Sequence, residues 1–350
     1  VSRVTAAGSP ADPTRPAHPP GVALSELAAG VGIAAELTGA EDIEVRGISL
    51  DSRRVRRGDL YAALPGSQAH GARFTGQALE AGAVAVLTDA EGAAEAAGNG
   101  LPLLVVDDPR AVLGATAATV YGHPADALRT VGVTGTQGKT TVTRLLDGGL
   151  LAAGVRSAAI GTVGTRIADE EVRTVLTTPE APDLHGLFAR MLELDVTACA
   201  MEVSSHALVM GRVDGVRFDV AVFTNLGRDH LDFHADVEEY FAAKATLFTP
   251  EHAALGLICI DDAYGRRLAD EAPIPVRTYS VTGEGDWTAH DVALGPDGSR
   301  FTVHGPGDVA VRASCPLPGD FNVANTLAAI AAAAEAGFDA QQVADGIARG

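Results

Sequence analysis

Apolar and polar positions alternate along this chain in blocks that predict strands and helices in turn. In the first third, apolar residues at 43–50 and 59–64 predict two strands around the polar stretch DSRRVRRG. Helical spacing in ARFTGQALEAG is followed by the apolar runs AVAVLTD and LPLLVVDDP, and then by a second helical stretch, AVLGATAATVYG. This alternation predicts a small α/β unit over residues 21–124.

A second unit, over residues 125–350, is predicted to be α/β with a mostly parallel sheet. It opens with a strand, a Gly-rich turn and a helix in RTVGVTGTQGKTTVTRLLDGGLLAAG. Continuous apolar runs, which suit strands buried on both faces of such a sheet, recur at 197–203, 219–225 and 255–261. Over residues 287–313 the pattern changes to short alternating strands around the turn GPDGS, which predicts a small antiparallel β segment.

Residues 1–20 stand apart from both units. They are rich in proline and alanine and contain two arginines but no apolar stretch, so they do not resemble a signal peptide. We expect them to form a disordered leader. The chain also lacks 18 consecutive apolar residues, so the sequence predicts no membrane span.

Composition narrows the classes of partner. The 350 residues carry a formal net charge of −19 at pH 7, which argues against a surface that binds nucleic acid or an anionic membrane. A phosphate-bearing ligand must then be held by local geometry, because the overall field repels it. Three cysteines lie far apart, without metal or redox spacing, and predict reduced structural thiols in a reducing compartment, the cytoplasm.

The stretch GTQGKTT, residues 135–141, follows the predicted strand TVGVT and precedes a helix. In such a loop, backbone N–H groups, a lysine ammonium and a helix N-terminus bind phosphate oxygens, and Thr140 offers a hydroxyl to Mg²⁺. Val133 occupies the place of the first glycine in the strict form of the motif. The alternative is a chance Gly-rich turn, and on this motif alone a small-molecule kinase or another ATPase stays open.

Lysine is almost absent from this chain. Of the 26 basic residues, only Lys139 in the phosphate loop and Lys244 in the predicted helix YFAAKATLF are lysines. Lys244 is either a surface cation or a residue at a site that requires an amine, which can react and change its charge as a guanidinium cannot. Its aromatic and leucine neighbours predict a partly apolar wall, which favours the uncharged amine.

Polar side chains gather at two further strand ends. Glu202 ends the strand TACAMEV, where a Mg²⁺ ligand is expected beside the phosphate loop of an open α/β sheet. The next strand is followed by TNLGRDHLDFH. Its carboxylates and imidazoles are either hydrogen-bonded loop residues or metal ligands: Asp229, His230, Asp232 and His234.

Taken together, these motifs resemble the Mur ligase family. They are, in order, VTGTQGKTT, TTPEAPDLH, MEVSSHAL, FTNLGRDHLDFH, YFAAKATLF and LPGDFNVANTLAA. The resemblance runs from about Leu50 to the end of the chain. It is specific to the MurE type, which extends the peptide of UDP-N-acetylmuramoyl-L-alanyl-D-glutamate in peptidoglycan synthesis. It implies a UDP-sugar domain at 21–124 and a central ATP-binding domain at 125–350.

The resemblance implies an ATP-dependent amide ligase. Such an enzyme phosphorylates the D-Glu carboxylate of UDP-MurNAc-L-Ala-D-Glu and joins the acyl phosphate to an incoming amino acid, expected here to be diaminopimelate. The resemblance also implies two Mg²⁺ ions, one bound by Thr140 and Glu202 and the other by His230 and Lys244. The catalytic residues are then Lys139, His230 and Lys244, and Lys244 is expected to react with CO₂ to form a carbamate.

The same resemblance assigns the remaining contacts. Those with ATP fall on Gly135, Thr136, Gln137, Gly138, Lys139, Thr140, Thr141, Asn322 and Asn325. Those with the UDP-sugar and its peptide fall on Leu50, Ser52, Ser67, Gln68, Ala69, Thr177, Thr178, Ser204 and Arg212. For the two asparagines, capping of the following helix is an equally physical alternative.

Members of the family carry a third, C-terminal domain that binds the incoming amino acid, and the chain ends about where that domain should begin. We expect the 350 residues to bind ATP and UDP-MurNAc-L-Ala-D-Glu, here called the nucleotide-dipeptide. We expect them to catalyse the ligation poorly or not at all. The alternatives are a non-catalytic nucleotide-binding module and a ligase acting on another nucleotide-linked acid. We expect the chain to be a monomer that binds small molecules. We expect it to bind neither nucleic acid nor membranes.

Overall fold

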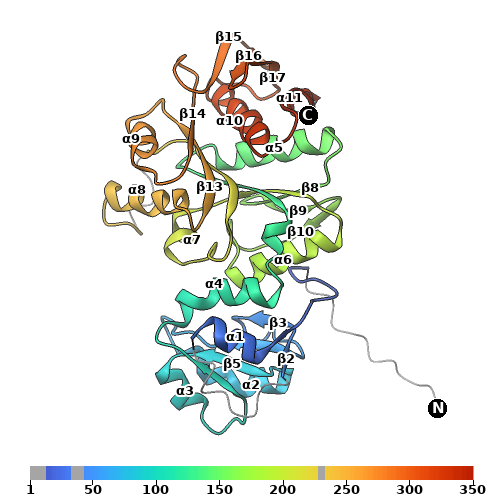
Figure 1. Cartoon of the computed structure of the whole chain (residues 1–350), viewed down its shortest axis with the longest axis vertical. Helices are drawn as coiled ribbons and strands as arrows, with labels where there is room; N and C mark the ends of the chain where they lie inside the picture. Colours follow the sequence, from blue (N-terminus) through green and yellow to red (C-terminus); the bar gives the residue numbers. More distant parts are fainter. Residues whose placement is uncertain (1–12, 33–42, 228–232, 350) are drawn as a thin grey trace, which may run out of the picture.

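The computed structural model describes residues 13–32, 43–227 and 233–349. Figure 1 shows the N-terminal unit at one end of the molecule, a large sheet with its helices in the middle, and the last strands of the chain at the other end. The two units predicted from the apolar pattern therefore each contain a sheet of their own.

The N-terminal unit is built on a four-stranded parallel sheet. Its strands lie in the order β3 (Gly47–Ser49), β4 (Asp59–Ala62), β5 (Ala85–Thr88) and β6 (Leu103–Val105). Its helices are α1 (Leu24–Gly30), η2 (Gly71–Phe74), α2 (Thr75–Ala81), α3 (Ala90–Ala96) and α4 (Pro109–Val120). Leucines of β4, β5 and β6 pack with those of α1 in one core, so burial of apolar side chains holds the layers together.

The strand predicted at 43–50 is divided in two. Its first part, β2 (Glu44–Val45), pairs antiparallel with β1 (Val22–Ala23), whereas its second part, β3, pairs parallel with β4. At the break, the Arg46 backbone N–H donates to the Gly58 carbonyl at 2.8 Å. The apolar pattern does not reveal the break, because Val45 and Ile48 are buried on either side of it.

The second unit contains an eleven-stranded sheet, in the order β10-β9-β8-β11-β7-β12-β13-β14-β15-β16-β17. The bounds in chain order are β7 Arg129–Thr134, β8 Ser157–Gly161, β9 Gly164–Ile167, β10 Glu170–Val172, β11 Ala198–Glu202, β12 Phe218–Phe223, β13 Ala253–Cys259, β14 Val276–Ser280, β15 Trp287–Gly295, β16 Gly298–Gly305 and β17 Val309–Cys315. The strands from β8 to β15 in the sheet are mutually parallel, and the others are added antiparallel at the edges. The predicted α/β fold, with its antiparallel segment, is confirmed.

Helices cover both faces of this sheet. They are η3 (Pro124–Ala127), α5 (Lys139–Ala152), α6 (Ala181–Glu193), α7 (Ser205–Val209), α8 (Val237–Ala245), η4 (Thr246–Phe248), α9 (Ala263–Glu271), α10 (Phe321–Glu335) and α11 (Ala340–Arg349). Along β12, Val220 and Val222 pack with α5, α10 and α11, while Ala221 and Phe223 pack with α6 and α8. Alternate side chains point to opposite faces of a strand, so a continuous apolar run feeds both layers.

All three cysteines are buried free thiols, as predicted for structural cysteines. Across the described parts of the chain, none of the helices combines the length and the apolar character needed to cross a bilayer.

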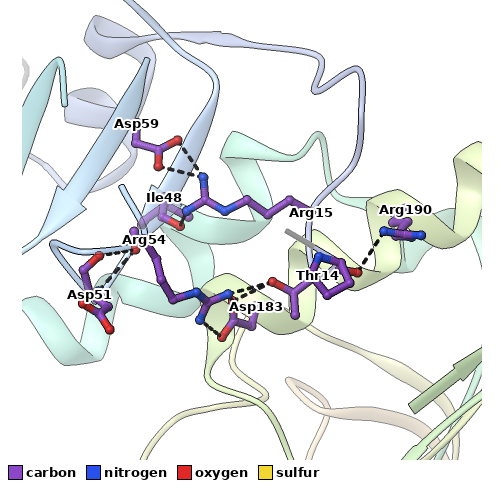
Figure 2. Close-up of polar contacts among 10 residues, drawn as sticks. Thr14, Arg15, Ile48, Asp51, Arg54, Asp59, Asp183 and Arg190 are labelled. Atoms are coloured by element: carbon purple, nitrogen blue, oxygen red, sulfur yellow. Dashed lines mark hydrogen bonds and ion pairs between the residues drawn. The ribbon is translucent and has the colours of Figure 1, made fainter. Parts of the chain in front are cut away.

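The prediction of a disordered leader over residues 1–20 is wrong for residues 13–20. Arg15 and Thr14 are 8% and 7% exposed, and Figure 2 shows both bonded to residues far along the chain. The Arg15 guanidinium donates to Asp59 at 2.7 Å, and the Thr14 hydroxyl donates to Asp183 at 3.0 Å. Composition suggested disorder because this segment is polar and proline-rich. Its partners are distant in sequence, so local composition does not reveal them.

Candidate active site

The phosphate loop lies between β7 and α5, and two of its positions require glycine. Gly135 and Gly138 have φ of +141° and +88°. A Cβ atom would lie 2.0 Å from Thr224 Oγ1 at the first position and 2.5 Å from Asn325 Oδ1 at the second. Val133 is a buried β7 residue aligned with Glu202, so the loop begins only after Thr134. This explains why the first glycine of the strict motif is absent.

Helix α5 begins at Lys139, immediately after the loop. The first backbone N–H groups of a helix have no acceptor within the helix, and its N-terminus carries a partial positive charge. Thr140 and Thr141 occupy this first turn and are half-buried. The arrangement can therefore bind a phosphate anion.

Thr224 and Asn225, directly after β12, brace the phosphate loop. The Thr136 and Gln137 amides donate to the Asn225 backbone carbonyl and side-chain oxygen, at 2.9 and 3.0 Å. In return, the Thr224 hydroxyl donates to the Gln137 carbonyl at 2.6 Å. Sequence reasoning assigned no role to these two residues. The sequence indicates them only by their place directly after a predicted strand. That strand, β12, is the parallel neighbour of β7, so its carboxyl end lies beside the phosphate loop.

The two lysines of the chain meet at one backbone atom. Lys139 Nζ donates to the Gly135 carbonyl at 2.7 Å and to the Thr136 carbonyl at 2.9 Å. Lys244 Nζ, at the far end of α8, donates to the same Gly135 carbonyl at 3.0 Å. Lys244 is 1% exposed, and its Nζ lies 4.4 Å from the centre of the Tyr240 ring. The surface-cation alternative for Lys244 is therefore wrong.

Glu202 ends β11 next to β7 and is 1% exposed. Its two carboxylate oxygens accept from the Thr162 backbone N–H at 2.9 Å and from the Thr162 hydroxyl at 3.1 Å. Gly161 leaves room for it, because a Cβ there would lie 2.1 Å from Glu202 Oε1. A buried carboxylate at this strand end, beside the phosphate loop, has the oxygen donors that Mg²⁺ prefers.

In the described parts of the chain, no three His, Cys, Asp or Glu side chains lie close enough together to hold a metal ion. His230 and the aspartates beside it lie outside the described residues. His234, by contrast, is buried with its Nε2 3.0 Å from Ser205 Oγ. Of the residues predicted to bind the ions, Thr140, Glu202 and Lys244 lie within the described parts of the chain.

Asn322 and Asn325 lie in the first two turns of α10, close to the phosphate loop. Asn325 Nδ2 donates to Asn322 Oδ1 at 3.1 Å. Asn325 also lies against Gly138 of the phosphate loop, where an added Cβ atom would be 2.5 Å from Asn325 Oδ1. The cap of α10 is Asp320, which accepts from the Phe321 N–H. The alternative that the asparagines cap this helix is therefore wrong.

Two adjoining cavities lie beside the turn SLDSRR. One, of about 670 Å³, is lined by residues of both units, and the other, of about 550 Å³, is lined mainly by the N-terminal unit. Leu50 lines both cavities, and Ser52, whose hydroxyl donates to Gln77 at 2.8 Å, lines the second together with Ala69. Ser67 and Gln68 are exposed and lie outside both linings.

Of the four residues predicted to touch the muramyl peptide, three belong to a hydrogen-bonded group around Glu202 and one bonds to a residue that lines the cavities. Thr177 Oγ1 lies 3.1 Å from the Thr162 hydroxyl, which also bonds to Glu202. The Thr178 hydroxyl donates to the Glu202 carbonyl at 2.9 Å and accepts from the Ser204 N–H at 3.2 Å. Arg212 Nε donates to Glu180, a residue that lines both cavities, at 2.9 Å.

A glycine loop between a parallel strand and a helix, with polar groups at the neighbouring strand ends, defines a phosphate-loop nucleotide-binding α/β protein. The model of the "Mur ligase middle domain" matches residues 133–333, and that of the "Mur ligase family, catalytic domain" matches residues 44–121. The chain belongs to the Mur ligase family.

Curated relatives extend this similarity over most of the chain. The UDP-N-acetylmuramoyl-L-alanyl-D-glutamate--2,6-diaminopimelate ligase of Streptomyces avermitilis is 57% identical over 339 residues, which cover 96% of this chain and 66% of that protein. The ligase of the same name from Corynebacterium glutamicum is 47% identical over 326 residues, covering 91% and 62%. The chain thus spans somewhat less than two thirds of the length of these relatives.

Solved structures of Mur ligases are also similar to this chain. A structure of UDP-N-acetylmuramoyl-L-alanyl-D-glutamate--2,6-diaminopimelate ligase is 30% identical with a TM-score of 0.79, over 94% of this chain and 66% of that one. MurF from Acinetobacter baumannii is 21% identical with a TM-score of 0.66, over 94% and 68%, and indicates the shared fold alone.

Proposed function

We propose that this chain is the nucleotide-sugar- and ATP-binding part of an ATP-dependent amide ligase that acts on UDP-MurNAc-L-Ala-D-Glu. The observation that carries the proposal is the meeting of Lys139 and Lys244 at the Gly135 carbonyl of the phosphate loop. A protein that only binds a nucleotide has no need of a second buried amine there. The names of the relatives support the nucleotide-dipeptide as substrate and diaminopimelate as the incoming amino acid.

In this reaction the substrate supplies the nucleophile. The D-Glu carboxylate attacks the γ-phosphorus of ATP and ADP leaves, which gives an acyl phosphate. The amine of the amino acid then attacks the acyl carbon, and phosphate leaves from the tetrahedral intermediate. The chain contributes positioning and charge neutralisation, with Lys139 and the first amides of α5 on the β- and γ-phosphates.

Two anions, the carboxylate and the triphosphate, must approach each other in this site. Mg²⁺, when bound, would neutralise part of their charge. Glu202 and Thr140 would hold one ion, and the resemblance to the family adds His230 and Lys244 for a second. Thr178 and Ser204 would place the peptide, because their hydrogen bonds tie them to the strand end that carries Glu202.

Lys244 would take its metal-binding form by reaction with CO₂. The neutral amine attacks the carbon of CO₂, a C–N bond forms and a proton is lost, which leaves a carbamate anion. Lys244 is 1% exposed and its Nζ lies 4.4 Å from the centre of the Tyr240 ring, so water is excluded around this amine. Arginine cannot replace it, since its guanidinium stays protonated.

The scarcity of lysine allows a direct test. Because the chain has two lysines, a ¹³C carbamate signal after incubation with ¹³CO₂ has two side-chain sources only, and we expect Lys244→Arg to remove it while Lys139→Arg retains it. Lys244→Arg should also lower nucleotide-dipeptide-dependent ADP release by about a hundredfold or more, the loss typical when a transition-state charge contact is removed. A carbamate signal that persists in Lys244→Arg, or unchanged ADP release, would reject the role of this lysine.

The isolated chain should bind UDP-MurNAc-L-Ala-D-Glu and ADP, but join the dipeptide to diaminopimelate far more slowly than the intact relatives do. Calorimetry with each ligand and a ligation assay measure the two properties. Equal binding of unrelated UDP-sugars would favour a different nucleotide-linked acid. Binding of ADP alone would favour the non-catalytic module.

A further inference from the structure

Residues 13–19, here called the N-terminal strap, join the two units of the molecule (Figure 2). The sequence of this strap is PTRPAHP, in which three prolines restrict the backbone and lower the entropy lost on ordering. Its first residues line the larger of the two cavities beside the turn SLDSRR. The function proposed above gives this strap no role.

Arg15 anchors the strap in the N-terminal unit. Its Nη1 donates to both carboxylate oxygens of Asp59, at 2.9 and 2.7 Å, and its Nη2 donates to the Ile48 carbonyl at 3.0 Å. The two side chains of the ion pair are 7% and 3% exposed. Asp59 opens β4 and Ile48 lies in β3, so this single guanidinium ties the strap to both strands that flank the turn SLDSRR.

Thr14 connects that turn to the central unit. Arg54, in the turn, makes a two-pronged ion pair with Asp183 of α6, at 2.9 and 2.8 Å. The Thr14 hydroxyl accepts from Arg54 Nη2 at 2.9 Å and donates to Asp183 at 3.0 Å. The Arg54 and Asp183 side chains are 39% and 26% exposed, so water weakens their attraction and the pair alone stabilises little. The hydroxyl adds the contact that fixes its geometry.

The strap also follows helix α6 along its length. The Arg190 guanidinium donates to the Pro13 carbonyl at 3.2 Å, and Glu193 accepts from the Ala17 and His18 amides at 2.7 and 2.6 Å. At Gly186, a Cβ atom would lie 2.5 Å from the Thr14 carbonyl oxygen. The helix thus presents a hydrogen-bonding edge and a gap that fit this segment.

We infer that the N-terminal strap is a positioning element of the nucleotide-sugar site, because Thr14 and Arg54 hold the turn SLDSRR against α6. The inference rests on the proposed function. Leu50 and Asp51 of this turn line both cavities, so any shift of the turn changes the shape of each. A turn that is already fixed before the ligand arrives costs less ordering on binding, which increases affinity.

A matched set of threonine substitutions in the whole chain tests the strap. Thr14→Val removes the hydroxyl and keeps the shape, whereas Thr14→Ser keeps the hydroxyl. Thr119→Val is the control, because Thr119 is a half-buried α4 residue whose hydroxyl donates to the Ala115 carbonyl within its own helix. The dissociation constants of UDP-MurNAc-L-Ala-D-Glu and of ADP are measured for each variant by calorimetry.

We expect Thr14→Val to raise the dissociation constant of the nucleotide-dipeptide roughly tenfold, the effect of one lost hydrogen bond to charged groups. Thr14→Ser and Thr119→Val should bind it like the wild type, and ADP should bind all four proteins equally. Unchanged nucleotide-dipeptide binding by Thr14→Val would overturn the inference. So would a parallel loss of ADP binding, which would indicate a general stabilising role. A wild-type chain that binds ADP but no nucleotide-dipeptide would instead overturn the proposed function, and the inference with it.

Discussion

At the scale of single residues, this molecule places charged groups where water is excluded and gives each a specific partner. Lys244 and Glu202 are each 1% exposed and bond to groups at the carboxyl ends of β7 and β8. Asp59 is 2% exposed, and burial raises the pKa of its carboxyl while Arg15 partly offsets that rise. Removing the partner of such a buried charged group lowers the stability of the protein, because the charge is then left unpaired away from water.

Arg15→Met tests this cost directly. We expect the free energy of unfolding to fall by about 3–5 kcal/mol near neutral pH, because Asp59 is left as a buried charge without its cation. The deficit should shrink as the pH falls, since a protonated Asp59 needs no cation. Urea denaturation at several pH values measures it.

Arg46→Met is the matched control for this change. Arg46 pairs with Glu44 through side chains that are 60% and 50% exposed. An exposed pair of this kind contributes only about 0–1 kcal/mol, so the control should unfold almost like the wild type. Equal losses in the two variants would contradict a special role for the buried pair.

At the scale of elements, helix α6 connects the parts of the site. It bonds to the strap through Asp183, Arg190 and Glu193, and its buried face packs under the central sheet. His185 lies on that face, completely buried, with Nε2 3.0 Å from the Asp214 carbonyl. Burial lowers the pKa of His185 to about 4.

The buried imidazole predicts a pH dependence of stability. In the unfolded chain His185 takes up a proton below about pH 6.5, whereas in the folded chain it does so only below about pH 4. Stability is therefore present above 6.5 and is lost as the pH falls between these values, by about 2 kcal/mol from pH 7.5 to 5. His185→Gln, whose amide can still donate to Asp214, should show a flatter curve in urea denaturation. Parallel curves would contradict this assignment.

A second test of α6 concerns its fit to the strap. Gly186→Ala places a methyl group against the Thr14 carbonyl, and we expect the free energy of unfolding to fall by about 1–3 kcal/mol. Gly148→Ala, in α5, is the control: nothing lies within 4 Å of its new Cβ. It should stabilise the protein by up to about 1 kcal/mol, because alanine favours a helix. Denaturation curves that rank the variants in the opposite order would reject the close packing of strap and helix.

At the scale of the whole molecule, different segments of the chain form the proposed sites for the two ligands. The phosphate loop belongs entirely to the central unit, whereas the larger cavity is lined by the strap, the turn SLDSRR and the N-terminal end of α6. Ligands at the two sites should therefore protect different segments.

Hydrogen exchange measures that difference. ADP should slow amide exchange at residues 135–141, where α5 begins. UDP-MurNAc-L-Ala-D-Glu should slow it at 49–54 and 177–183, in segments contributed by both units, because a bound ligand suppresses local opening. Protection of 49–54 by ADP alone would contradict the proposed separation of the sites.

The sequence by itself determined the α/β fold and the phosphate loop, and it singled out Lys244 as a candidate, because each depends on local chemistry: apolar runs, glycines before a helix, and two lysines in an arginine-rich chain. Only the tertiary structure decided the roles of Thr224, Asn225 and the N-terminal strap. Their partners lie on neighbouring strands or on α6, up to 177 residues away. Composition near a residue describes its own segment, whereas an ordered polar segment owes its stability to groups that the fold alone brings within hydrogen-bond distance.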